Sequence, residues 1–157
     1  MAGVQDWVLL AYRMPREPSS PRITVWRRLR KLGAVQIVDG LVALPADART
    51  KEQLEWVADL ALEAGGDASV WIARLSSARQ ERELAARMAA EVAEAYQAVV
   101  DEVAELRARP DAIQQRTLGR LRRELRRIAQ RDYFPPAVRS EAVAGVAGLA
   151  EMVGASP

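Results

Sequence analysis

The sequence predicts an α+β fold, with a βαββαβ domain over residues 1–75 and a bundle of three helices over residues 76–157. In the first half, short apolar runs rich in β-forming residues alternate with segments whose apolar residues recur at helical spacing. From Ser77 onward only the helical spacing remains. At 157 residues, the chain is long enough to bury a core without disulfides or a metal.

The first strand and helix are predicted on either side of a proline-rich turn. Residues 6–12 form an apolar run that ends before Pro15. The serine pair at 19–20 can cap a helix whose first position is Pro21, and Gly33 is typical of a helix end. The apolar residues of this helix recur at helical spacing, at Ile23, Trp26, Leu29 and Leu32.

A hairpin is predicted next. Apolar runs at residues 34–38 and 41–45 flank Asp39 and Gly40, and this dipeptide is typical of two-residue hairpin turns. We therefore expect two antiparallel strands here.

The second helix and the last strand complete the first domain. A capping box of Thr50 and Gln53 predicts the helix start, and Gly65-Gly66 stops the helix before an apolar run at 68–75. The resulting order predicts the ferredoxin-like arrangement, an antiparallel four-stranded sheet with two helices on one face. The central strands are apolar on both faces, so the open face needs a cover. The C-terminal helices and a second subunit, in a homodimer, are competing predictions for that cover.

The C-terminal half predicts three helices. A second capping box, Ser77 with Gln80, begins a long helix that Pro110 terminates. Another helix is expected to open near Asp111, and Pro136 suits the first turn of the last one.

Composition excludes most familiar catalytic sites. The chain has no Cys and no His, which removes thiolate nucleophiles, the commonest general base and the commonest metal ligands. We find no convergent carboxylate pair and no glycine-rich phosphate loop, so we expect no enzyme, no cofactor and no metal. No signal peptide and no membrane span are evident, and a soluble cytoplasmic protein is expected.

One candidate site is an arginine-rich turn and helix. Arginines here, beside the free N–H groups of a helix N-terminus, would suit phosphate, sulfate or a similar oxyanion. A solvated face of an amphipathic helix explains the same charges equally well. The residues are Arg13, Arg16, Arg22, Arg27, Arg28, Arg30 and Lys31.

A second candidate is the basic helix of the C-terminal half, which could lie against a nucleic-acid backbone. Its main candidates are Arg116, Arg120, Arg123 and Arg127, and Arg122, Arg126 and Arg131 lie in the same segment. The long helix before it is acidic, so pairing between the two helices is the favoured alternative. Among the tryptophans, Trp26 is expected in the core, with a cost of about 3–5 kcal/mol for its loss. Trp56 is a candidate for facing a partner.

Specific segments resemble a known family. They include Trp-Val-Leu-Leu-Ala-Tyr-Arg-Met-Pro-Arg at 7–16, Trp-Arg-Arg-Leu-Arg-Lys-Leu-Gly at 26–33, Leu-Val-Ala-Leu-Pro at 41–45 and Arg-Asp-Tyr-Phe-Pro at 131–135. These segments closely resemble the N-terminal domain of ChrB-type chromate-resistance proteins. The resemblance implies a chromate-responsive regulator that binds operator DNA. A further C-terminal domain is typical of the family, and if chromate sensing belongs to it, sensing would be absent from these 157 residues.

The first domain also resembles the middle domain of the phenylacetate-pathway repressor and the small CRISPR-associated nucleases. In those nucleases an aspartate at the end of the first strand binds the catalytic metal, whereas this chain has Arg13 there. The leading hypothesis is therefore a non-enzymatic module that binds DNA, with chromate or a sulfate-like oxyanion gating it at the arginine-rich turn. The alternative is an oxyanion-binding or protein-interaction module without DNA contact.

Overall fold

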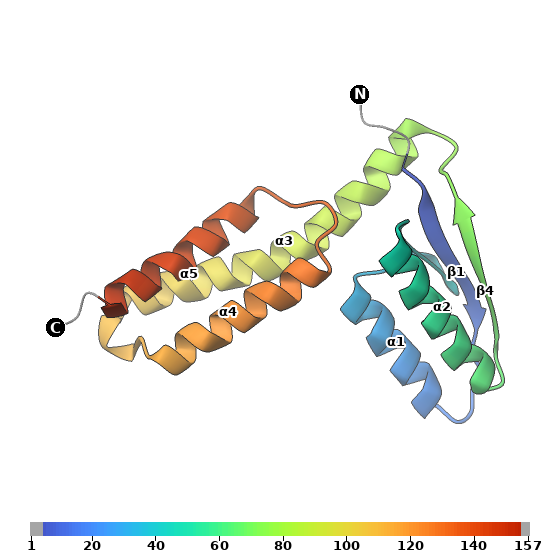
Figure 1. Ribbon diagram of the computed structural model, residues 1–157, viewed down its shortest axis with the longest axis horizontal. Helices are drawn as coiled ribbons and strands as arrows, with labels where there is room; N and C mark the ends of the chain where they lie inside the picture. Colours follow the sequence, from blue (N-terminus) through green and yellow to red (C-terminus); the bar gives the residue numbers. More distant parts are fainter. Residues whose placement is uncertain (1–4, 155–157) are drawn as a thin grey trace. The chain divides into compact units, whose positions relative to one another are not determined.

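The computed structural model describes residues 5–154, and the chain divides into two compact units, Met1–Ala85 and Ala86–Pro157 (Figure 1). The first unit contains β1 (Trp7–Arg13), α1 (Ser20–Leu32), β2 (Val35–Val38), β3 (Leu41–Pro45), α2 (Ala48–Glu63) and β4 (Asp67–Ala73). The second contains α4 (Gln115–Gln130) and α5 (Val138–Gly154), after a short 3-10 turn, Pro110–Ala112. Helix α3 (Ala78–Ala108) begins in the first unit and continues into the second.

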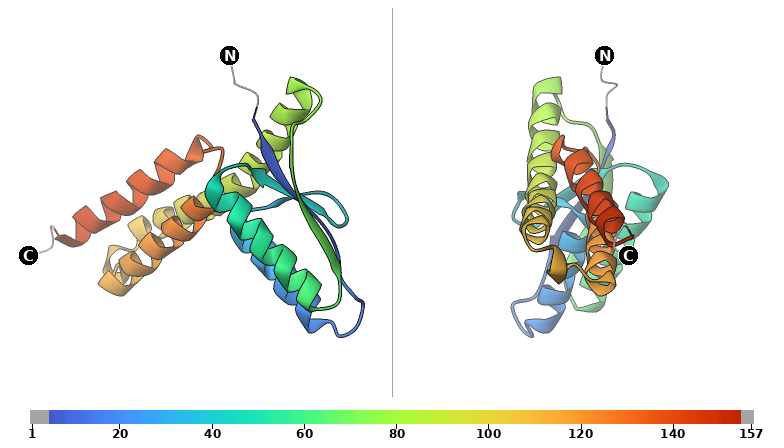
Figure 2. Two further views of the ribbon diagram at one scale, coloured as in Figure 1. Left: turned by 45° about the vertical axis from the view of Figure 1, so that its right-hand side comes forward. Right: turned by 90° about the vertical axis from the view of Figure 1, so that its left-hand side faces the viewer.

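The four strands form one antiparallel sheet in the order β2-β3-β1-β4. Helices α1 and α2 lie side by side against one face of this sheet (Figures 1 and 2). Val8 and Leu10 of β1 point towards these helices, because alternate residues of a strand share one face. Both are 0% exposed, as is Leu54 of α2, so the covered face is apolar. The expected mixed α+β fold with an antiparallel sheet and C-terminal helices is confirmed.

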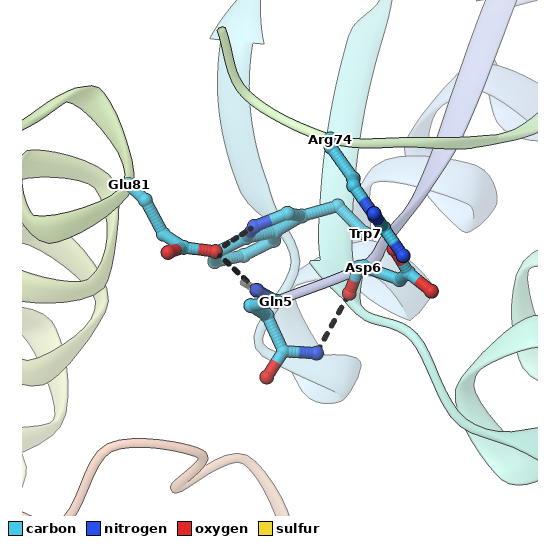
Figure 3. Close-up of polar contacts among 5 residues, drawn as sticks. All are labelled: Gln5, Asp6, Trp7, Arg74 and Glu81. Atoms are coloured by element: carbon cyan, nitrogen blue, oxygen red, sulfur yellow. Dashed lines mark hydrogen bonds and ion pairs between the residues drawn. The ribbon is translucent and has the colours of Figure 1, made fainter. Parts of the chain in front are cut away.

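The first turn of α3 is attached to the other face of the sheet (Figure 3). Glu81 Oε1 accepts hydrogen bonds from the backbone N–H of Gln5, at 2.8 Å, and from Nε1 of Trp7, at 3.4 Å. Arg74 and Asp6 form an ion pair beside these contacts, with Nε of Arg74 2.5 Å from Oδ1 of Asp6. Trp7 is only 2% exposed, so part of the second apolar face is covered within the first unit itself.

Two glycines let loops approach β1 closely. Gly40 has a φ of 77°, and a Cβ there would lie 2.6 Å from the carbonyl oxygen of Tyr12. A Cβ on Gly66 would lie 2.2 Å from the carbonyl oxygen of Arg13. Real Cβ atoms do not come this close to an oxygen, so the hairpin turn and the start of β4 both require glycine.

Three local expectations are wrong. The capping box of α2 consists of Asp47 and Thr50, because Asp47 Oδ1 accepts from the Thr50 N–H at 2.7 Å while the Thr50 hydroxyl accepts from the Asp47 N–H at 2.9 Å. Helix α4 begins at Gln115, well after Asp111, because Pro110 starts a separate 3-10 turn. The last strand ends at Ala73, two residues before the expected end at position 75.

The expectation that Trp26 lies in the core is also wrong, because its side chain is 54% exposed. Helix α1 buries Val25, Leu29 and Leu32. Leu29 and Leu32 lie four and seven positions after Val25, so the three residues form one stripe along the helix. Trp26 lies about 100° around the helix from Val25, outside this stripe.

The second unit is a bundle of α3, α4 and α5 around its own core. Its buried residues are Val92, Tyr96, Val99, Val103, Leu118, Leu121, Ile128, Ala142, Val146 and Leu149. Tyr96 is 1% exposed, and its hydroxyl donates a 2.9 Å hydrogen bond to Oδ2 of Asp132, in the turn between α4 and α5. The Asp132 side chain is itself 1% exposed, so this polar pair is part of the core.

Candidate functional site

The seven basic residues of the predicted turn and helix do not share one pocket. Five of them lie on α1, where residues five positions apart are separated by about 140° around the axis. Arg22 and Arg27 therefore face different sides of the helix. Arg16 is exposed in the turn before α1, and Arg30 is stacked on Trp26, with Cζ 5.1 Å from the ring centroid. Arg13, at the end of β1, forms an exposed ion pair with Asp67 of β4.

Arg22 lies in an open groove on one side of α1. The groove has a volume of about 340 Å³ and is lined by Tyr12, Met14, Arg22, Ile23, Trp26 and Gln36. Partial burial, and then the negative charge of Asp39, raise the pKa of the Tyr12 hydroxyl above its usual value. Ser19 occupies the N-cap position just before α1, but its side chain makes no capping hydrogen bond. The serine cap predicted here is therefore absent. The first turn of α1 thus keeps backbone donors close to Arg22.

Three other cations lie on the opposite side of α1, against α2. This second groove, of about 440 Å³, is lined by Thr24, Arg27, Arg28, Lys31, Trp56 and Leu60. The Arg28 guanidinium carbon is 4.0 Å from the centroid of the Trp56 ring. Nε of Arg28 is buried and has no hydrogen-bond partner among residues 5–154. Trp56 remains 52% exposed, and its role in contacting a partner stays a prediction.

The arginines of α4 are arranged differently, because they cover one continuous side of a single helix. Leu118, Leu121 and Ile128 are buried and define the inner side of α4. The outer side, opposite these residues, contains Arg116, Arg120, Arg122, Arg123, Arg126 and Arg127, and we call it the α4 arginine face. Glu124 is the only acidic residue of α4, and it lies between the α4 arginine face and the buried side of the helix.

Two arginines of this face are paired. Arg120 contacts the carboxylate of Glu102 on α3 through both terminal nitrogens, and this bidentate contact raises the pKa of the guanidinium further. Nη1 of Arg127 lies 3.6 Å from Oε2 of Glu124 on its own helix. The other four, Arg116, Arg122, Arg123 and Arg126, are exposed and form no ion pair with any residue of the described part of the chain. Pairing with the acidic helix therefore accounts for Arg120 alone.

Sequence reasoning missed two interactions that shape these regions. Arg28 stacks on Trp56 from another helix, and Tyr96 bonds Asp132, 36 residues later. Neither pair has a sequence signal, since the partners are far apart in the chain. The turn at 131–135 is singled out by the family resemblance and by Arg131 of the basic segment, but neither indicates the contact between Tyr96 and Asp132.

One family model matches the chain. Its description is "Protein ChrB, N-terminal", and the match extends over residues 22–154. The chain belongs to the ChrB N-terminal family. Membership implies a regulatory protein associated with chromate resistance. No curated protein and no solved structure matches the chain.

The family match bears unequally on the two arginine sets. It includes α1 from Arg22 onward and all of α4, while Arg13 and Arg16 lie outside it. Within residues 5–154, no group of three or more acidic side chains is placed to hold a metal ion. None of the helices described here is both long enough and apolar enough to cross a membrane.

Proposed function

We propose that this ChrB-family chain is a non-enzymatic, DNA-contacting module of a chromate-responsive transcriptional regulator, acting in the cytoplasm. The observation that carries the proposal is the α4 arginine face, where four guanidinium groups have no carboxylate partner in the described chain. We also propose the ferredoxin-like assignment for the first unit, which is supported by its βαββαβ element order and its antiparallel sheet.

A rigid helix with arginines along one side suits a phosphate backbone. Residues 116, 120, 123 and 127 follow one another at intervals of four, three and four, so they form one row along the helix. Each arginine that neutralises a phosphate releases a counterion, which favours binding at low salt. Guanidinium groups already paired with carboxylates would lose those pairs on binding, so the unpaired arginines are the stronger phosphate ligands.

Neutralising three unpaired arginines is expected to weaken DNA binding at low salt by about tenfold or more. The variant carries Arg122→Gln, Arg123→Gln and Arg126→Gln, and binding is measured by fluorescence anisotropy with operator-region and unrelated duplexes. The matched control carries Arg49→Gln, Arg79→Gln and Arg82→Gln, which remove the same charge from exposed positions on α2 and α3. Equal losses in both variants would mean that net charge alone, and not the α4 arginine face, governs binding.

The groove beside Arg22 favours a second candidate function, the binding of chromate or a sulfate-like oxyanion. Ser19 leaves the first turn of α1 uncapped, whereas Asp47 caps the first turn of α2. An anion near Arg22 would meet both the backbone donors of α1 and a guanidinium group.

Chromate and sulfate are therefore expected to raise the melting temperature progressively as the anion concentration exceeds its dissociation constant, and Arg22→Gln should remove this increase. Arg49→Gln is the matched control, since Arg49 lies in the first turn of the capped helix α2. The measurement is a thermal melt at constant ionic strength with chloride as the reference. If chromate stabilises both variants as strongly as the unmodified chain, the anion does not bind at the start of α1.

A further inference from the structure

The outer edge of β4 has an unusual composition for an exposed strand. β4 is the last strand of the sheet, and no strand within residues 5–154 pairs with the outer side of its backbone. Figure 1 shows it at the rim of the first unit. Natural edge strands usually carry a charge or a proline in their middle, which discourages pairing with another chain. In this edge strand, residues 68–73 include neither.

The same strand exposes large apolar side chains on both of its faces. Trp71 is 60% exposed and Ile72 is 53% exposed. Neighbouring residues of a strand point to opposite faces of the sheet, so one helix packed on one face could not bury both. Another strand paired along the edge would pack beside both side chains.

We propose that β4 is the interface of a homodimer, in which β4 of one chain pairs antiparallel with β4 of a second copy. The two four-stranded sheets then join across a two-fold axis into one continuous sheet. The register that fits the side chains places Val70 opposite the partner's Val70 at the axis.

In this register, large and small side chains face each other. Trp71 lies opposite the partner's Ser69, and Ile72 lies opposite the partner's Ala68. Within one chain, Nε1 of Trp71 already donates a 2.8 Å hydrogen bond to Oγ of Ser69. The two-fold symmetry repeats each pairing, so each face of the joined sheet contains two such pairs of a large and a small side chain.

The charges at the two ends of β4 are already paired within the chain. Asp67 opens the strand and Arg74 follows its last residue. Asp67 pairs with Arg13 and Arg74 pairs with Asp6, and antiparallel pairing around Val70 places Asp67 opposite the partner's Ala73. A parallel pairing in register would instead place Trp71 opposite the partner's Trp71, so the match of large with small side chains favours the antiparallel dimer and a second copy of this chain as the occupant.

The oligomeric state tests the interface directly. Sedimentation velocity over a hundredfold concentration range is expected to show a monomer–dimer equilibrium for the unmodified chain. Trp71→Lys places a charge in the middle of the edge and should shift the chain to monomer, while Leu62→Lys, at an exposed apolar residue of α2, should leave the dimer intact. A monomer at every concentration, or a dimer unaffected by Trp71→Lys, would overturn the proposal.

Cross-linking tests the register independently, because the chain contains no native cysteine. Under mild oxidation, Val70→Cys is expected to form a disulfide-linked dimer, since the two β-carbons face each other across the axis. Val38→Cys, on the opposite edge strand β2, is the matched control and should remain monomeric on reducing-agent-free gels. Cross-linking through residue 38 but not through residue 70 would place the interface on β2 and contradict this inference.

Discussion

Replacing Trp7 with alanine is expected to lower the free energy of unfolding by about 3–5 kcal/mol. Trp7 is 2% exposed and lies on a central strand between Pro45 of β3 and Ala73 of β4. Its indole also donates to Glu81, so the substitution removes a large buried ring and a hydrogen bond. A small cavity of about 50 Å³ already adjoins the ring, and the void left by alanine would enlarge it.

Trp26→Ala is the matched control for this prediction. Trp26 is 54% exposed and contacts Arg30, so its loss should cost about 1 kcal/mol or less. Urea unfolding followed by far-ultraviolet circular dichroism measures both variants. A larger loss of stability for Trp26→Ala than for Trp7→Ala would contradict the assignment of Trp7 to the core.

Tyr96 is the corresponding residue of the second unit. Tyr96→Ala is expected to cost about 3–5 kcal/mol, because the ring is 1% exposed and lies among the core residues of the bundle. Tyr96→Phe keeps the ring and should cost about 1–3 kcal/mol. Tyr96→Phe still lowers stability because it removes the hydrogen bond to Oδ2 of Asp132, which then keeps Nη1 of Arg139, 3.8 Å away, as its ion-pair partner. Oδ1 of Asp132 is already buried without a hydrogen-bond partner among residues 5–154.

The same residue predicts a pH dependence at high pH. Burial first, and then the hydrogen bond to Asp132 and its charge, raise the pKa of Tyr96 to about 12. The folded chain thus holds the phenol proton more tightly than the unfolded chain, whose tyrosine has a pKa of about 10. The stability contributed by this proton is complete below pH 10 and decreases as the pH rises towards 12.

Urea titrations between pH 8 and pH 12 measure this decrease. Tyr96→Phe removes the titrating group, so its stability should fall less steeply over the same interval, with a residual slope from Tyr12, whose pKa is also raised. Identical slopes for the variant and the unmodified chain would show that the Tyr96 hydroxyl is not buried against Asp132.

Much of the fold follows from local sequence patterns. The strand at 41–45, the glycine that ends α1 and the hairpin at Asp39-Gly40 are all found where they are predicted. These features depend on backbone preferences of individual residues, which a sequence displays directly. The end of β4 and the start of α4 are less predictable, because neighbouring positions within a few residues of each other can all serve as a strand end or a helix cap.

The sequence does not determine which side of a helix packs against its neighbours, and this limits the prediction of the sites. In α1, spacing is consistent with a stripe through Trp26 and with one through Val25, and only packing against the sheet selects the second. That choice separates Arg22 from Arg27 and divides the predicted arginine cluster between two grooves. For α4, the sequence indicated both acid pairing and a free basic surface, and the contact between Arg120 and Glu102 shows how little of the face is paired.

The salt dependence of DNA binding tests the central claim most directly. For the unmodified chain, the logarithm of the association constant should fall linearly with the logarithm of salt concentration. The Arg122→Gln, Arg123→Gln, Arg126→Gln variant should reduce that slope by about 2.7, since each lost phosphate contact accounts for about 0.9. The control lacking Arg49, Arg79 and Arg82 should keep the original slope. If the unmodified chain binds no DNA at low salt, or if the two variants have the same slope, the α4 arginine face does not contact the phosphate backbone.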